Sequence, residues 1–336
     1  MRTLVLAVAG ALLLAGCGIN FTGHVTVHRT SGKTKPPGEA ASSGNKSKAR
    51  AKRHRGVVAI AAGWNAGYAL KADGRVWAWG NNSIGELGNG TNTESDLPVQ
   101  VSDLTGVTAI TGGGYAGYAL KSDGTVWAWG DNYDGHLGNG NTLKSYVPVQ
   151  VSGLTGVTAI AAGIYSGYAL KSDGTVWAWG DNRHGQLGNG TATNSDVPVQ
   201  VSGLAGVTAI AAGNNDGYAL KTDGTVWAWG ANSGGQLGNG TTTNSDVPVQ
   251  VSGLTRVTAI AAGTFSGYAL KSDGTVWAWG DNSMGQLGDG TSGGYSNMPV
   301  EVHGLSGPRP SSPVTVNGTP PGTGTPPGSE YPYHPE

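Results

Sequence analysis

The sequence predicts an all-β protein, a β-propeller of about five four-stranded blades. The first observation is a stretch, 169–180 in its third copy, that occurs five times at a spacing of 50 residues. A repeat of this length is typical of propellers, solenoids and arrays, in which one supersecondary unit stacks on its copies. The second is that glycine makes up 60 of the 336 residues, and no segment shows a sustained helical period. Both features favour short strands joined by tight turns.

Each repeat contains four short runs that favour β-structure. In the third repeat the first two runs are 157–162 and 167–171. The third, 176–180, follows a Ser-Asp-Gly-Thr hairpin, in which glycine accepts the positive φ of a tight turn. The fourth run, 197–201, contains Pro198, which cannot donate to a central ladder and so indicates an outer strand. Four antiparallel strands per radial repeat form one propeller blade, and the repeated tryptophans suit the faces between blades.

The repeat resembles that of the regulator of chromosome condensation family. The similarity rests on the Val-Thr-Ala-Ile-Ala-Ala-Gly start, the segment 169–180 and the Gly-Gln-Leu-Gly-Asn-Gly motif, and it covers about 57–305. It implies a β-propeller, and known members include a nuclear nucleotide-exchange factor, a plant ultraviolet-B receptor and the secreted beta-lactamase inhibitory protein II. Family propellers usually have seven blades, so five repeats leave open a five-bladed ring, an open arc completed by a partner, or a dimer. Where the family often has His, this chain has Tyr68, Tyr118, Tyr168, Tyr218 and Tyr268.

The first residues resemble a bacterial lipoprotein signal. Arg2 precedes an apolar run from Leu4 to Leu14, which has the length of a signal peptide rather than of a membrane span. Leu14-Ala-Gly-Cys17 resembles a lipobox, and Cys17 is the only cysteine. We therefore expect removal of 1–16 and lipidation of Cys17, palmitate included, which anchors the chain at the extracytoplasmic face of the cell membrane. The alternative is an ordinary secretory signal with a chance cysteine.

The flanks of the repeats differ from them in composition and charge. We expect residues 17–55 to form a lipidated, basic, disordered tether and residues 308–336 a Pro/Gly-rich disordered tail. Segment 18–55 has nine Lys/Arg and one acid, a net charge of plus eight, whereas from 56 onward ten Lys/Arg oppose twenty acids. The basic run 46–55 either lies on anionic lipid head groups or is a solvated spacer. Nucleic-acid binding is not expected, because the folded part is acidic.

The propeller is predicted to cover 56–307. Its five repeats are expected at 56–105, 106–155, 156–205, 206–255 and 256–306. In the tail, the segment 313–316 has the pattern of the fourth strand and is a candidate to close a sheet edge.

The repeats differ mainly in their first and third connections. In an antiparallel meander both connections lie at one end of the sheet, whereas the uniform Asp-Gly hairpins and Ser-Gly-Leu turns lie at the other. One rim is therefore expected to be diversified, and its aromatic and Arg side chains are types enriched in protein interfaces. We expect this rim to bind a macromolecular ligand; the alternative is drift of loops that tolerate change. The predicted rim residues are Trp64, Asn65, Ile84, Tyr115, Tyr133, Asp134, Tyr165, Arg183, His184, Asn214, Asn215, Asp216, Phe265 and Met284.

No catalytic set stands out, and the chain is predicted not to be an enzyme. His136, His184 and His303 occupy different positions of their repeats, and no phosphate-binding Gly-Lys-Ser/Thr motif occurs. Segment 181–185 lacks the alternating acids and final Glu of a calcium loop, so neither metal nor cofactor is expected. The prediction is a non-catalytic, membrane-anchored module that binds an unknown protein or cell-wall ligand. The alternatives are a beta-lactamase-inhibitor-like protein, a cell-wall glycan-active enzyme, a structural spacer and, by family analogy, guanine-nucleotide exchange.

Overall fold

The computed structural model describes residues 56–305. These residues form 20 strands and no helix, and the strands form five four-stranded sheets. The predicted signal peptide, Cys17, the tether, the tail and the segment 313–316 lie outside the described residues. Among residues 56–305, no helix long and apolar enough to span a bilayer is found.

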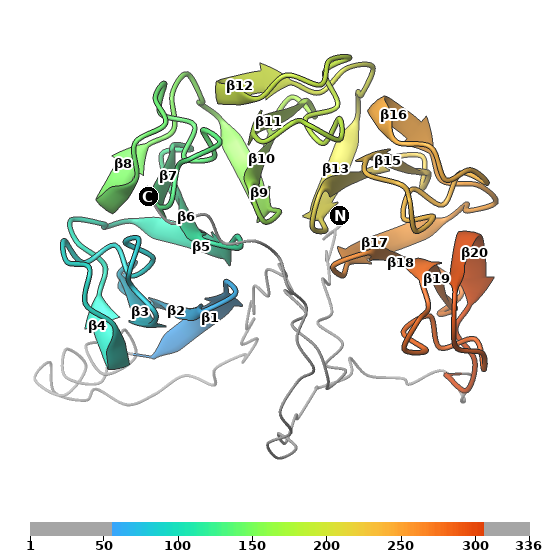
Figure 1. The fold of residues 1–336 in the computed structure, drawn as a ribbon, viewed down its shortest axis with the longest axis horizontal. Helices are drawn as coiled ribbons and strands as arrows, with labels where there is room; N and C mark the ends of the chain where they lie inside the picture. The colour runs from blue at the N-terminus through green and yellow to red at the C-terminus, as the bar shows by residue number, and fades with distance from the viewer. Residues whose placement is uncertain (1–55, 306–336) are drawn as a thin grey trace, which may run out of the picture.

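Each sheet is one blade, an antiparallel meander whose strands pair in chain order (Figure 1). The strands are β1 (Val57–Ala62), β2 (Ala66–Lys71), β3 (Val76–Gly80) and β4 (Ser95–Gln100) in blade 1; β5 (Val107–Gly112), β6 (Ala116–Lys121), β7 (Val126–Gly130) and β8 (Ser145–Gln150) in blade 2; β9 (Val157–Ala162), β10 (Ser166–Lys171), β11 (Val176–Gly180) and β12 (Ser195–Gln200) in blade 3; β13 (Val207–Ala212), β14 (Asp216–Lys221), β15 (Val226–Gly230) and β16 (Ser245–Gln250) in blade 4; and β17 (Val257–Ala262), β18 (Ser266–Lys271), β19 (Val276–Asp281) and β20 (Tyr295–Glu301) in blade 5.

The second hairpin of each blade confirms the turn that the sequence indicates. In blade 3, Gly174 has φ +79°, and Asp173 Oδ1 accepts hydrogen bonds from the main-chain N–H of Thr175 (3.0 Å) and from its hydroxyl (2.6 Å). The two tryptophans of β11 lie on one face, because side chains two apart on a strand point the same way. Trp179 is fully buried, whereas Trp177 is half-buried with the Lys171 Nζ 5.5 Å from its ring centroid. The tryptophans of a pair thus differ in burial.

The hydrophobic core is divided among the junctions between consecutive blades. At each junction the second Trp of one blade donates its indole N–H to a main-chain carbonyl of the preceding blade, as Trp179 does to His136 at 2.9 Å. The same carbonyl accepts the hydroxyl of the preceding blade's tyrosine, here Tyr118 at 2.7 Å. This shared acceptor gives a structural role to the tyrosine that stands where the family often has His. The other three indole bonds are Trp129 to Glu86, Trp229 to Gln186 and Trp279 to Gln236.

The five blades form an open arc rather than a closed ring (Figure 1). Ile60, on the free face of blade 1, is 67% exposed, whereas its counterpart Ile110 is 1% exposed at a junction. At the other end Leu305 is 56% exposed, against 2% for its counterpart Leu104. Of the arrangements that the repeat count left open, residues 56–305 adopt the arc.

Candidate functional site

The candidate site is the rim formed by the first and third connections of the blades. Because every sheet is a meander, the connections that follow β1 and β3 lie at the same end of blade 1, and likewise in the other blades. All but two of the fourteen predicted rim residues are exposed or half-exposed. The two exceptions are Asp134 and Asp216, which are buried.

Aromatic side chains from three successive blades meet on this rim. Trp64 contacts Tyr115 edge to face, with ring centroids 5.0 Å apart and an interplanar angle of 73°. Tyr115 in turn stacks on Tyr165, with centroids 5.7 Å apart and an angle of 29°. Trp64 is 39% exposed and both tyrosines are half-buried, so the three rings present a continuous aromatic surface with accessible edges. Phe265 is also exposed, on blade 5.

The third connection is held by a buried asparagine that the sequence analysis did not single out. In blade 3, Asn182 Oδ1 accepts the main-chain N–H of Leu187 at 2.9 Å. Its Nδ2 donates to the carbonyls of Thr191 (2.9 Å) and Thr193 (3.0 Å). An asparagine occupies this position in all five repeats, and this regularity in the sequence indicates its structural role. It fixes the loop, so that the varied residues after it, Arg183 and His184, lie exposed.

Arg183 links two blades instead of presenting a free guanidinium. Its Nε donates to Asp181 at 2.7 Å within blade 3, and its Nη2 donates to Asp134 of blade 2 at 3.1 Å. Asp134 also accepts a hydrogen bond from Asn194 Nδ2 at 3.0 Å. Burial raises the pKa of Asp134, and the positive charge of Arg183 opposes this shift. Asp134 therefore joins the loops of blades 2 and 3.

Asp216 lies in the core of blade 4, below the rim. Its carboxyl Oδ2 contacts the hydroxyl of Tyr218, which also hydrogen-bonds to the carbonyl of Gln236 at 2.7 Å. Complete burial raises the pKa of Asp216 to about 7. Asp216 thus shapes the fold rather than the accessible surface.

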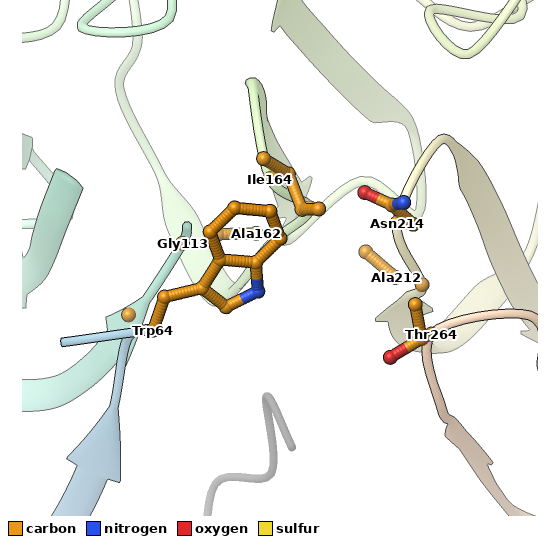
Figure 2. A pocket seen from close by; sticks show the side chains of 10 residues that line it. Trp64, Gly113, Ala162, Ile164, Ala212, Asn214 and Thr264 are labelled. Carbon is orange, nitrogen blue, oxygen red and sulfur yellow. The ribbon is translucent and has the colours of Figure 1, made fainter. Parts of the chain in front are cut away.

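The first connections of the five blades line a small cavity at the inner side of the arc. Figure 2 shows Trp64, Ile164, Asn214 and Thr264 around a cavity of about 10 Å³, roughly the space of one water. A series of main-chain hydrogen bonds joins the blades here: Trp64 N–H to Gly114, Gly114 to Ile164, Ile164 to Asn214 and Asn214 to Thr264, at 3.1–3.2 Å. The cavity is too small for an organic cofactor. Within residues 56–305 no group of three or more His, Cys, Asp or Glu is arranged to hold a metal ion.

These features define a repeat propeller with one diversified rim, and comparison with known proteins gives its family. The sequence matches the RCC1-like domain over residues 1–317. The chain therefore belongs to the RCC1-like domain family, which confirms the resemblance. No curated protein sequence matches the chain.

Three solved structures are similar to the chain. Human WBSCR16 is 27% identical, with 73% of this chain and 67% of that chain covered and a TM-score of 0.65. Yeast RCC1 (Prp20) bound to Kap60 is 24% identical, with 74% and 64% covered and a TM-score of 0.65. Prp20p from Saccharomyces cerevisiae is 23% identical, with 74% and 66% covered and a TM-score of 0.65. This chain thus spans about two thirds of the length of these structures.

Proposed function

We propose that the chain is a non-catalytic binding module that holds a protein partner on its diversified rim. The observation that supports this most strongly is the surface of Trp64, Tyr115 and Tyr165, whose rings touch in series across three blades. Large aromatic side chains supply much of the binding energy in protein interfaces, because they bury a large area at a low entropic cost. The opposite rim repeats the same hairpin in nearly every blade, so the difference between copies is concentrated where the aromatics lie.

The family gives this proposal a precedent. One of the similar structures is yeast RCC1 (Prp20) bound to Kap60, and another is Prp20p from Saccharomyces cerevisiae, described with its binding properties to Gsp1p and histones. Those partners belong to the yeast proteins. For this chain the proposal extends only to the use of a propeller as a binding surface, with a protein or a cell-wall ligand as partner.

The test is capture of a partner by crosslinking on intact cells, followed by mass spectrometry. We expect the triple variant Tyr115→Ala, Tyr165→Ala and Phe265→Ala to lose the captured partner. The control variant replaces three valines of the outer strands by Ala: Val147, Val197 and Val247, each 39–40% exposed. This variant should capture the partner normally. Equal capture by both variants would exclude the rim as the binding surface.

We further propose that the module works at the extracytoplasmic face of the membrane, anchored by a lipid on Cys17. The support is the sequence: an apolar run of signal length followed by Leu-Ala-Gly-Cys. A Cys17→Ser variant is expected to leave the membrane fraction for the soluble fraction. Retention of the variant in the membrane fraction would contradict the lipid anchor.

A further inference from the structure

One carboxylate on the rim lacks the partners that its counterparts have. The same position of the repeat is occupied by Asp131, Asp181 and Asp281 in blades 2, 3 and 5. Asp181 accepts hydrogen bonds from Gln186 Nε2 (2.9 Å) and Arg183 Nε (2.7 Å). Asp281 likewise accepts from a glutamine amide (2.7 Å) and a serine hydroxyl (2.9 Å). Within residues 56–305, no hydrogen-bond donor reaches the carboxylate of Asp131, whose side chain is 21% exposed.

The cause is a histidine at the position of that glutamine. His136 replaces Gln in blade 2, and its Nε2 lies 3.8 Å from Asp131 Oδ2, beyond hydrogen-bond distance. The imidazole is fully buried, and neither ring nitrogen has a partner among the described residues. Burial lowers the pKa of His136 to about 4, so the ring is neutral at physiological pH and gives Asp131 no positive charge. Among residues 56–305, a buried ring nitrogen and a carboxylate, both without a hydrogen-bond partner, therefore face each other at this point of the rim.

The aromatic surface adjoins the same point. The ring of Tyr165 lies against His136 with centroids 6.0 Å apart, and Tyr115 stacks on Tyr165. Burial and Tyr115 make the larger contributions to the raised pKa of Tyr165, and Asp131 raises it further. The negative charge of Asp131 therefore acts on the Tyr165 phenol. Aromatic faces attract cations through the quadrupole of the ring, and a neighbouring carboxylate adds direct charge attraction.

The local charge is negative. Asp131 raises the pKa of Glu86 and of Asp134, in each case as a smaller contribution than burial. Arg183 is already bound to Asp134 and Asp181, and Lys144 makes only the smallest of the contributions to the pKa of Glu86. A carboxylate that receives no donor from the described part of the chain, in a negative field and beside stacked phenols, matches a planar cation that both donates hydrogen bonds and stacks on rings.

We propose that Asp131, Tyr115 and Tyr165 form a subsite for the guanidinium group of an arginine side chain on the partner. The guanidinium donates two parallel hydrogen bonds to the Asp131 carboxylate while its plane contacts the tyrosine rings. This inference rests on the proposed rim function and names the chemistry of the group recognised there. It assigns Asp131 a role that neither the exposure of the rim nor its aromatic content indicates.

The probe is N-acetylarginine amide, and binding to the full chain is measured by saturation-transfer difference NMR. Its matched control is N-acetylcitrulline amide, which has nearly the same shape and no charge. We expect the arginine probe to bind at least tenfold more tightly than the citrulline probe. Asp131→Asn should weaken arginine binding at least fivefold, whereas Asp246→Asn, an exposed acid on β16, should change it less than twofold.

A second variant separates loss of the subsite from loss of folding. His136→Gln should place an amide on Asp131, as Gln186 does on Asp181, and should weaken arginine binding at least threefold in a chain that remains folded. Equal binding of the two probes, or unchanged arginine binding in both Asp131→Asn and His136→Gln, would overturn the subsite. If Asp131→Asn loses the arginine probe and still captures the protein partner, the rim function stands and arginine is not the group that carries it.

Discussion

At the scale of single residues, Asp216 is a buried acid whose neighbours require its proton. A phenol carries one hydrogen, and Tyr218 donates it to the Gln236 carbonyl at 2.7 Å. The contact with Asp216 is then satisfied when the carboxyl is protonated and donates, as the Ser166 hydroxyl does to Tyr168 at 3.2 Å in blade 3. The raised pKa of Asp216, about 7, agrees with this arrangement.

The first prediction is that Asp216→Ser stabilises the fold at alkaline pH. The folded state holds a proton on Asp216 that the unfolded state releases near pH 4, so its contribution to stability is present at low pH and is lost as pH rises towards 7. The slope is about 1.4 kcal/mol per pH unit over this window. Urea unfolding should show Asp216→Ser more stable than the wild type by about 2–4 kcal/mol at pH 8, and similar to it at pH 4. A constant difference between the two proteins from pH 4 to 8 would contradict a protonated Asp216.

His136 has the opposite effect on stability, because its pKa is lowered from 6.5 to about 4. The unfolded state takes up a proton that the folded state excludes, so stability falls as pH drops from about 6.5 to about 4. The second prediction is that His136→Gln abolishes this acid sensitivity and gains about 1–3 kcal/mol at pH 4.5, with a smaller gain at pH 7.5. The measurement is urea unfolding at both pH values. A variant that loses stability equally with the wild type on acidification would show that His136 is not the group responsible.

At the scale of strands and loops, the sequence predicts the elements closely. The expected third-repeat runs 157–162, 167–171, 176–180 and 197–201 correspond to β9–β12, with ends that differ by at most two residues. Period-2 patterning and the Asp-Gly turns are local, so they can be found without tertiary information. The burial of Asp134 could not be found in this way, because it depends on Arg183 and Asn194, 49 and 60 residues away in the next blade. The surroundings of Asp216 likewise involve a residue outside its own strand, because the Tyr218 hydroxyl that it contacts is bonded to Gln236, 18 residues further along the chain from Tyr218.

The third prediction compares one tryptophan at a junction with its copy at the free end. Trp229 is fully buried and donates to Gln186 at 2.8 Å, whereas Trp79 lies half-exposed on the free face of blade 1. Each ring packs on the equivalent glycine of its own blade, so the pair differs mainly in the presence of a preceding blade. Trp229→Ala should cost about 3–5 kcal/mol, and Trp79→Ala less than about 2 kcal/mol, in urea unfolding. Equal costs would indicate that the face of blade 1 is covered in solution.

At the scale of the whole molecule, the main strand contacts between blades in residues 56–305 join blades that are consecutive in the chain, so the arc has the energetics of a repeat array. The repeat count alone could not indicate closure, because the angle between blades is set by side chains packed at the junction. The end faces carry the residues that are buried elsewhere: Leu305 is 56% exposed, whereas Leu254 is 1% exposed at the junction of blades 4 and 5. Removal of a terminal blade from such an array exposes the face of the blade before it. The end face that is removed with the terminal blade has the same composition, so the exposed apolar surface stays nearly constant.

The fourth prediction follows from this balance: a chain that ends after residue 255 keeps four folded blades. Its new end face, with Leu254 and Val251, repeats the face that blade 5 presents with Leu305 and Val302. Far-UV circular dichroism should show retained β-structure, and the denaturant m-value should fall by about one fifth, because m scales with the surface exposed on unfolding. The control ends after residue 230 and so also lacks β16, the outer strand of blade 4, and it should lose the order of that blade. Global unfolding on removal of blade 5 alone would mean that the five blades depend on one another around a closed circuit, and that the arc of Figure 1 is completed in solution.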